Sequence, residues 1–389
     1  MAGSLADPRR ALLLGFYHAA LAAVDGRRCV RAALASDRKE GAISAVAVGK
    51  AAASMMLGAA DALGSRLQRG LIVAPSGGIA SELTGLTGMI CIEAGHPRPD
   101  ERSLEAGRML LEFASATPAG SRVLLLVSGG ASALLEVPAP GVSLAELRKL
   151  YDHSLAERLD IESLNAKRRA LSLIKGGRLP GLFRGSDVEA LMISDVPRDD
   201  PAVLGSGLLA APGFKPILVG SLDDALDAIE HAARARGLVA VRERVRLAGD
   251  AEDAARRICR ELAAGSSRLL ITGGETVVRL PAEPGRGGRC QHLAVTAACC
   301  FAGHPEFMLL AAGTDGRDGT SEDAGALVDG DTLRRATECG FDAKAALAAA
   351  DTGRLLEATG DLVYTGDTGT NVGDIVLALR LHPTVSPPM

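Results

Sequence analysis

The sequence contains no tryptophan, and aromatic residues make up only 3% of its 389 positions. So few rings leave little material for stacking the bases of a single-stranded nucleic acid. Lysine and arginine (43) are slightly outnumbered by aspartate and glutamate (47), which gives a net charge of −4 and no basic field for a phosphate backbone. We therefore expect no nucleic-acid partner.

Long apolar runs are also missing, since no stretch approaches the ~18 residues that a membrane span requires. The run "ALLLGFYHAALAAV" after Arg9-Arg10 faintly imitates a signal peptide. It contains Tyr17 and His18, however, and it continues into a second helical pattern. We expect an ordinary helix there and no membrane segment.

Cysteine patterns are absent as well. The seven cysteines are odd in number and irregularly spaced, and none forms a C-x-x-C pair. Neither a disulfide framework nor a zinc site is indicated, and a reducing cytoplasm is the expected compartment.

What the chain does contain is an alternation of strand-like and helix-like runs. The first series predicts strands at 42–49, 69–75, 122–127 and 188–196, and helices at 50–64, 105–116, 144–159 and 161–177. The second predicts strands at 214–221, 238–244, 268–274, 275–280 and 306–313, with helices at 222–237, 250–264 and 291–302. A long Gly/Asp-rich loop, two more helices, a closing segment and a frayed tail at 382–389 follow. This alternation predicts an α/β protein with a parallel sheet covered on both faces, and two domains, 1–212 and 213–389.

Polar groups follow the predicted strands of the first domain. Gly49-Lys50, Ser128-Gly129-Gly130 and Ser194-Asp195 each come directly after a strand. Ligands of open parallel sheets bind beyond the carboxyl ends of the strands, and amides at a helix N-terminus bind anions. We therefore predict that the bare turn in "LLLVSGGASALLE" (124–136) receives an anion, although a plain tight turn stays open. Its spacing fits neither a P-loop nor G-x-S-x-G.

The second half offers two further candidates. "GRGGRCQH" (285–292) places Arg286 and Arg289 among glycines, which suits phosphate or carboxylate binding, while a basic hairpin tip is the alternative. The acidic loop "GTDGRDGTSEDAGALVDGDT" (313–332) lacks the EF-hand spacing. It is either a loop near magnesium or phosphate, or a solvated acidic loop.

Several motifs, in order along nearly the whole chain, together resemble the glycerate 2-kinase family. They include "VAVGKAA" (46–52), "EAGHPRPDERS" (93–103), "LLLVSGGASALLE" (124–136), "LNAKRRALSLIKGGRL" (164–179), "LMISDVPRDDPAVLGSG" (191–207), "TGGETVV" (272–278), "GRGGRCQHLAVTAA" (285–298), "AAGTDGRDGTSEDAGALVDG" (311–330) and "DLVYTGDTGTNVGDIVLAL" (361–379). The resemblance implies an N-terminal Rossmann-like domain and a C-terminal MOFRL-type α/β domain with a mixed sheet. It places the active site in the cleft between them. After Gly207 this chain is shorter than the family pattern, and Cys290 stands where the family usually has Asn.

The resemblance also implies an activity and a set of residues. The activity is transfer of a phosphoryl group from ATP, with Mg²⁺, to the 2-hydroxyl of D-glycerate. The residues expected to act in catalysis are Lys50, Arg289 and Asp195. Those expected to bind substrate or phosphate are Ser128, Gly129, Gly130, Ser132, Asn165, Lys175, Gly287 and Gly288. Those expected to bind nucleotide are Gly274, Glu275, Thr314, Asp315, Thr370 and Asn371, with Asp195 and Asp315 as metal ligands.

Two other functions remain as alternatives. An NAD(P)-dependent hydroxypyruvate reductase would need G-x-G-x-x-G after a strand, and "GKAAAS" after the first strand has a single glycine. A non-catalytic sugar-phosphate-binding module would keep the anion loops without needing both Lys50 and Asp195. A homodimer is an open expectation.

Overall fold

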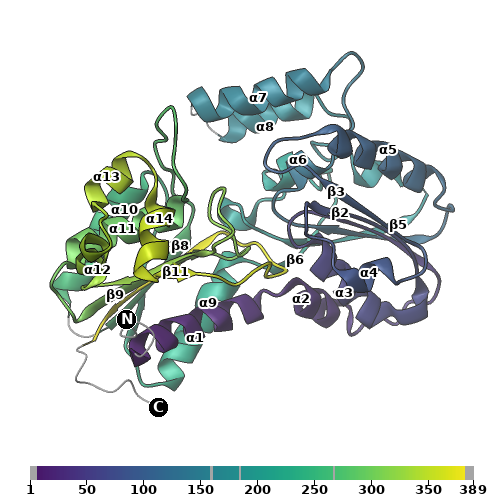
Figure 1. Ribbon diagram of the computed structural model, residues 1–389. Helices are drawn as coiled ribbons and strands as arrows, with labels where there is room; N and C mark the ends of the chain where they lie inside the picture. Colours follow the sequence, from purple (N-terminus) through teal and green to yellow (C-terminus); the bar gives the residue numbers. More distant parts are fainter. Residues whose placement is uncertain (1–6, 158–160, 184, 266–267, 382–389) are drawn as a thin grey trace. The chain divides into compact units, whose positions relative to one another are not determined.

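The chain forms two compact units in the computed structural model, which describes residues 7–157, 161–183, 185–265 and 268–381 (Figure 1). The N-terminal unit comprises Val24–Ser221 and Gly369–Val372. The C-terminal unit comprises Met1–Ala23, Leu222–Thr368 and Gly373–Met389. The predicted tail at 382–389 and the last two residues of the predicted helix 144–159 lie outside the described residues.

The N-terminal unit is built on a six-stranded sheet in which all paired strands are parallel. In spatial order the strands are β3 (Met89–Ala94), β2 (Leu67–Pro75), β1 (Ile43–Val48), β4 (Arg122–Val127), β5 (Asp187–Ile193) and β6 (Ile217–Gly220). Every residue of β1 is buried, as expected for a central strand covered on both faces. The strand order reverses between β1 and β4, and such a reversal is where ligands bind in open α/β sheets.

Helices cover both faces of this sheet (Figure 1). They are α2 (Gly26–Leu34), α3 (Ala52–Leu63), α4 (Ser81–Thr84), α5 (Glu101–Ser115) and α6 (Ala131–Leu134). The helices α7 (Leu144–Glu157) and α8 (Ile161–Ala170) form a hairpin that stands away from the sheet (Figure 1). The α5 helix begins four residues before the predicted start, because Asp100 and Ser103 form a capping box. The α8 helix ends before the predicted residue 177, and Gly176 and Gly177 both adopt a left-handed backbone.

The C-terminal unit contains a mixed sheet of six strands. In spatial order they are β11 (Leu362–Val363), β10 (Gly325–Asp329), β9 (Phe307–Gly313), β12 (Asp374–Arg380), β8 (Arg268–Gly274) and β7 (Ala240–Arg242). Only the β7–β8 pair is parallel. The sequence analysis missed β10, which forms inside the predicted acidic loop, and the predicted strand at 275–280 is irregular.

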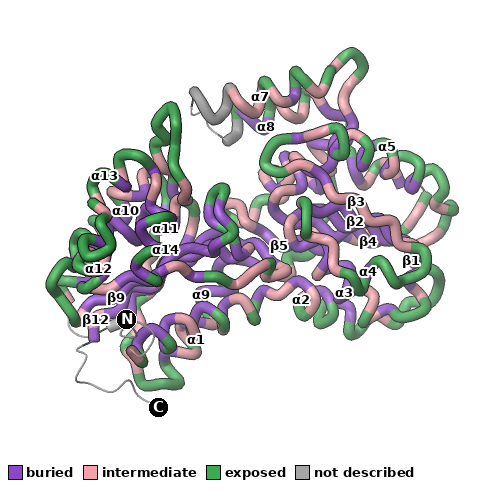
Figure 2. Tube along the Cα trace, in the orientation of Figure 1, coloured by how far each residue is buried: buried purple, intermediate pink, exposed green. Residues whose placement is uncertain are grey.

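The helices of this unit bury the sheet and one another. They are α1 (Pro8–Ala23), α9 (Leu222–Ala235), α10 (Ala251–Ala264), α11 (Arg289–Phe301), α12 (Thr332–Glu338), α13 (Ala343–Ala348) and α14 (Thr352–Thr359). Three helices rather than the predicted two follow the acidic loop. The strands of both sheets are largely buried, and exposed residues concentrate in helix outer faces and loops (Figure 2).

The N-terminal apolar run is the helix α1, which packs against α9. The Arg9 side chain donates to the carbonyl oxygens of Pro305 (2.6 Å) and Leu381 (2.8 Å), and the Tyr17 hydroxyl donates to the carbonyl oxygen of Gly313 (2.6 Å). These contacts attach the start of the chain to the C-terminal unit. Among the described residues, no helix is both long and apolar enough to cross a membrane.

The compact units divide the chain differently from the expected domains 1–212 and 213–389. The strand that we expected to open the second domain is β6, which pairs in parallel with β5 of the first sheet. Residues 369–372 return to the N-terminal unit, where the Thr370 hydroxyl donates to the carbonyl oxygen of Val24 (2.6 Å). All seven cysteines are free thiols.

Candidate functional site

Three predicted residues gather at the carboxyl ends of β1, β4 and β5, where the strand order reverses. The Lys50 amide donates to the carbonyl oxygen of Gly129 (2.9 Å), which joins the turns after β1 and β4. The amide group of Asn371 donates to a carboxylate oxygen of Asp195 (2.8 Å). Lys50, Gly129 and Asp195 therefore share one edge of the N-terminal sheet. Asn371, expected from the second domain, lies in this unit too.

The glycine at 129 is explained first by protein contacts. A Cβ atom there would lie 1.9 Å from a carboxylate oxygen of Asp195 and 2.3 Å from the Asn371 side-chain nitrogen. Similarly, a Cβ at Gly49 would lie 2.2 Å from the Ser128 hydroxyl oxygen. The glycine at 129 thus leaves room for the Asp195–Asn371 pair. From the sequence, we had expected the bare turn to make room for a ligand.

Ser128, predicted to bind an anion, has partners within the protein for both of its polar groups. It is fully buried, its amide donates to the carbonyl oxygen of Val48 (3.0 Å), and its hydroxyl accepts the amide of Ala51 (3.0 Å). Both polar groups therefore hold the turn that leads into α3. In the part of the chain that the structure describes, the amides of Gly129 and Gly130 have no hydrogen-bond partner, so anion binding by these two amides stays a prediction.

The helix after this turn is shorter than the sequence pattern suggested. Gly130 has φ of 84°, and α6 spans only four residues. A single turn sums few peptide dipoles, so the anion preference must come from the turn's own amides rather than from a helix macrodipole.

Two predicted substrate residues, Ser132 and Asn165, are joined through Ser206. The Ser206 hydroxyl donates to the Asn165 side-chain oxygen (2.9 Å) and lies 2.8 Å from the Ser132 hydroxyl oxygen. Because the proton of Ser206 is committed to Asn165, Ser132 must donate to Ser206. Ser132 then keeps oxygen lone pairs as acceptors, and the Asn165 amide nitrogen keeps its hydrogens as donors.

Lys175, for which phosphate binding stays a prediction, is enclosed in the N-terminal unit. Its side chain is 2% exposed and forms an ion pair with the equally buried Glu136. Burial lowers the pKa of Lys175, and the Glu136 carboxylate opposes that shift. A fully enclosed ammonium with its own carboxylate has a structural role, since truncation of either partner would leave a buried charge unpaired.

A second group of predicted residues lies at one edge of the C-terminal sheet. Glu275 follows β8, Thr314 and Asp315 follow β9, and the first residue of β12, Asp374, is in register with both Gly274 and Gly313. The antiparallel position of β12 between β8 and β9 therefore brings its N-terminal end to the carboxyl ends of those strands. Asp374 was not among the predicted residues.

Arg289 is the centre of this group. Its Nε and Nη2 atoms donate to the two carboxylate oxygens of Asp374 (2.5 and 3.0 Å), and Nη2 also donates to Glu275 (2.7 Å). Burial alone would lower the pKa of Arg289, but the two carboxylates raise it above its usual range. Burial raises the pKa of Asp374, and Arg289 opposes that change. The side chain of Arg289 remains 35% exposed.

The glycines before Arg289 also make room for protein atoms. A Cβ at Gly288 would lie 2.2 Å from the Asp318 carboxyl carbon, and one at Gly287 would lie 2.6 Å from the Thr352 hydroxyl oxygen. Asp318 accepts the amides of Cys290 (3.0 Å) and Gln291 (2.7 Å), so it caps α11 from outside the helix sequence. In the sequence, Asp318 is one of several acids in the loop 313–332, and its role as a cap of α11 could not be predicted.

Asp318 gives a testable dependence of stability on pH. Burial raises its pKa from 3.8 to about 7, so between these values the folded protein holds a proton that the unfolded chain has released. The free energy of unfolding contributed by Asp318 therefore falls as pH rises from about 4 to 7, by up to about 1.4 kcal/mol per pH unit. As pH rises over that range, the free energy of unfolding of Asp318→Asn should fall less than that of wild type. Urea unfolding at pH 5, 6 and 7 would measure both. Parallel curves for the two proteins would contradict the assignment.

Two threonines predicted to bind nucleotide, Thr314 and Thr370, form hydrogen bonds to the backbone of neighbouring loops. The Thr314 hydroxyl donates to the carbonyl oxygen of Gly373 (2.6 Å), and Thr370 is held as described above. Both side chains are essentially buried. Gly274 has φ of 145°, and a Cβ there would lie 2.3 Å from the carbonyl oxygen of Leu247. These residues shape the strand ends, and direct nucleotide contact by them stays a prediction.

Comparisons with known proteins agree with this arrangement of two units. Residues 12–233 match the family described as a domain of unknown function (DUF4147), and residues 268–374 match the MOFRL family. A D-glycerate 2-kinase of Thermotoga maritima is 33% identical over 377 residues, covering 86% of this chain and 89% of the relative. The chain belongs to the glycerate 2-kinase family.

Glycerate kinase of Thermotoga maritima also provides a solved structure of the same fold. Its crystal structure matches with a TM-score of 0.83 at 31% identity, covering 96% of this chain and all of the other. An Agrobacterium vitis protein that carries a provisional name as a hydroxypyruvate reductase is 34% identical over 331 residues, covering 73% of this chain and 86% of that protein. The resemblance inferred from the motifs is confirmed, and the α/β fold with a parallel and a mixed sheet is confirmed with it.

The sequence predicts two carboxylates, Asp195 and Asp315, as ligands of magnesium. Among the described residues, no group of three or more His, Cys, Asp or Glu side chains is arranged to hold a metal. The predicted ligands Asp195 and Asp315 belong to different units. Mg²⁺ commonly binds to one or two carboxylates and completes its shell with substrate phosphates and water, so the residues present fit Mg²⁺ that arrives with a nucleotide.

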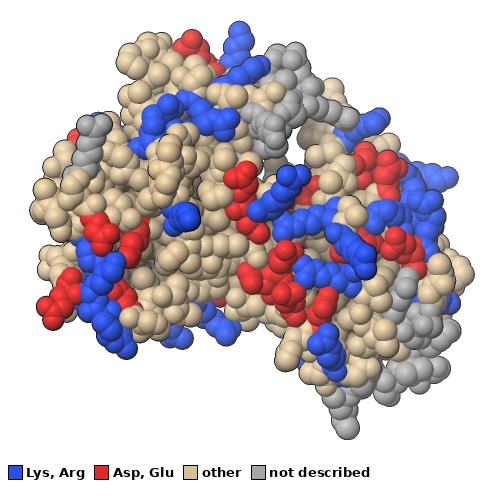
Figure 3. Space-filling view, turned by 180° about the vertical axis from the view of Figure 1, so that it is seen from behind, with Lys and Arg blue, Asp and Glu red and all other residues tan. Residues whose placement is uncertain are grey.

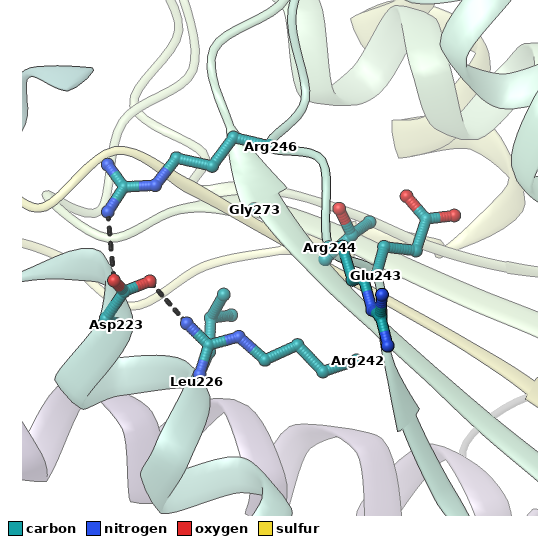
Figure 4. A pocket seen from close by; sticks show the side chains of 8 residues that line it. Asp223, Leu226, Arg242, Glu243, Arg244, Arg246 and Gly273 are labelled. Carbon is teal, nitrogen blue, oxygen red and sulfur yellow. Dashed lines mark hydrogen bonds and ion pairs between the residues drawn. The ribbon is translucent and has the colours of Figure 1, made fainter. Parts of the chain in front are cut away.

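A cavity of about 370 Å³ lies in the C-terminal unit of this family member, and its lining includes Gly273, next to the predicted residues Gly274 and Glu275 (Figure 4). It is lined by Asp223, Leu226, Arg242, Glu243, Arg244, Arg246, Thr272 and Gly273. Arg242 and Arg246 reach Asp223 from two sides, and Arg242 also donates to Asp227 (2.5 Å). Because Arg242 and Arg246 are compensated by these carboxylates, we assign the cavity no ligand.

Proposed function

We propose that this protein transfers the γ-phosphoryl group of ATP to the 2-hydroxyl of D-glycerate. The observation that carries the proposal is the edge at which Lys50, Asp195 and the amides of Gly129 and Gly130 converge, these amides having no partner among the described residues. Phosphoryl transfer needs a positioned hydroxyl, a proton acceptor and charge stabilisation, with little covalent chemistry from the protein. This edge supplies each of those groups.

We assign roles by chemical type. Asp195, held by Asn371, accepts the proton of the 2-hydroxyl. Lys50 and Arg289 stabilise negative charge on the transferred group, which is where a cation lowers the barrier most. When bound, ATP supplies the phosphoryl group and Mg²⁺ neutralises its charge. A cytoplasmic location and a homodimer remain predictions.

The alternative reductase activity is not favoured by the turn after β1. A dinucleotide-binding fold carries several glycines there, whereas α3 begins from "GKAA" and the Gly49 backbone is packed against Ser128.

On the face seen in Figure 3, basic and acidic side chains are intermingled.

A coupled assay tests the proposal. Protein, Mg-ATP and D-glycerate should release ADP in proportion to glycerate, and phosphorus NMR of the product should show the 2-phosphate. Parallel wells with NADH and hydroxypyruvate should show no change in absorbance. Excess EDTA should abolish ADP release and added Mg²⁺ should restore it. NADH oxidation without glycerate-dependent ADP release would overturn the proposal in favour of the reductase.

A further inference from the structure

Arg168 differs from most arginines of this protein in having no partner. It lies on α8 with its side chain half-buried. In the described part of the chain, its guanidinium makes no hydrogen bond and has no carboxylate within ion-pair distance, whereas the next residue, Arg169, reaches the carbonyl oxygen of Ala202. A half-buried cation without a counterion is costly unless an anion from outside completes it.

The helix places Arg168 toward the edge already described. Residues three positions apart share a helix face, so Arg168 lies on the same face as Asn165. Asn165 is linked through Ser206 to Ser132, which is the second residue of α6 after the Gly129-Gly130 turn. The face of α8 that carries Arg168 is therefore the face that borders this turn.

Among the residues whose side chains are described, one other cation, Lys175, lies within electrostatic range of Arg168. Tyr151 of α7 lies within electrostatic range of both Arg168 and Lys50. The one acid within such range of Arg168 among the described residues is Glu136, and that carboxylate is already paired with Lys175. Burial lowers the pKa of Arg168, which agrees with a cation that is desolvated in the absence of a ligand.

We infer that Arg168 binds the carboxylate of the hydroxy-acid substrate and thereby selects acids over neutral polyols. A carboxylate rather than a polyphosphate suits this position, because a triphosphate calls for several cations and only one unpaired guanidinium lies here. The planar fork of arginine matches a carboxylate with two hydrogen bonds. Beside it, the Ser132 acceptor and the Asn165 donor suit hydroxyl groups. This inference rests on the proposed function for the identity of the acid.

Calorimetric titration without nucleotide tests the inference directly. Replacing Arg168 with Met keeps length and apolar stem but removes the charge, so we expect D-glycerate affinity to fall about 100-fold, as for a lost charged hydrogen-bond pair. In the kinase assay KM for glycerate should rise similarly, while kcat and KM for ATP stay within about threefold. The neutral analogue glyceramide should bind wild type and Arg168→Met equally weakly.

Matched variants separate binding from folding. Lys167→Met removes one charge from the exposed neighbouring position and should leave glycerate affinity unchanged. Arg168→Lys should recover part of the affinity, and it replaces the Met variant if that one does not fold. Equal glycerate affinity in wild type and Arg168→Met, or a raised KM for ATP alone, would overturn the inference.

Failure of the proposed function gives a different result. If wild type neither binds nor phosphorylates D-glycerate, the titration is repeated with lactate, tartronate and malate. Loss of affinity for a bound acid in Arg168→Met would then support the carboxylate site without the kinase reaction, and unchanged or absent binding of every acid would overturn it.

Discussion

Asp195→Asn is expected to lower kcat for glycerate phosphorylation by about 10³-fold while changing KM little, because a general base contributes roughly 10²–10⁴ to the rate. The substitution keeps size and one oxygen, so the turn after β5 and its contact with Gly129 are preserved. The amide cannot accept the hydroxyl proton. Steady-state kinetics at saturating Mg-ATP would measure the change.

The control for this variant lies five residues further on. Asp200 is exposed, and its side chain accepts the amide of Ala202 (2.8 Å), a bond that Asn can also accept. Asp200→Asn should therefore retain wild-type kcat. If Asp195→Asn turned over within tenfold of wild type, Asp195 would be a structural acceptor for Asn371 rather than the base.

The strand ends of the N-terminal unit could be predicted from sequence because their signals are local. A buried strand followed at once by Gly49-Lys50 or Ser194-Asp195 specifies a carboxyl end, and the alternation of elements specifies parallel strands. The rule for open α/β sheets then places these ends near one another. That reasoning needs no knowledge of which residues touch. The structure confirms the predicted strands of this unit and adds β3, which was not predicted.

Which atoms approach each glycine could not be predicted, because these contacts come from residues far away in the sequence. Gly129 faces Asp195 and Asn371, which lie 66 and 242 positions further along the chain. The sequence pattern of a bare turn is the same whether a ligand or a side chain approaches it. The buried ion pair of Lys175 could not be predicted for a related reason, since a lysine in a basic motif gives no sign that Glu136 is buried opposite it.

Pairing across the sheet explains the other omissions. Asp374 begins an antiparallel strand, so the N-terminal end of β12 brings it beside the carboxyl ends of β8 and β9. Strand-end reasoning based on parallel sheets does not consider the N-terminal end of a strand. The attachment of α1 to the C-terminal unit likewise depends on contacts of Arg9 and Tyr17 with residues almost 300 or more positions away. An amphipathic run alone does not say which sheet it covers.

Arg289→Met is expected to lower kcat by about 10³-fold and also to destabilise the C-terminal unit. The loss of rate follows from removing a cation that stabilises charge in phosphoryl transfer. The loss of stability, about 3–5 kcal/mol, follows because Asp374, whose side chain is 7% exposed, would keep a buried carboxylate without its partner. It should be largest at high pH, where Asp374 cannot escape by taking up a proton. Urea unfolding and kinetics on the same preparations would measure both effects.

The double variant Arg289→Met/Asp374→Asn separates the two effects. With both charges removed, no buried carboxylate is left unpaired, and Glu275 is half-exposed and therefore solvated, so most of the stability should return. The kcat should stay about 10³-fold below wild type, because the cation needed for phosphoryl transfer is still absent. Recovery of turnover together with stability would instead show that Arg289 serves only to neutralise Asp374, and the charge-stabilising role would then rest on Lys50 alone.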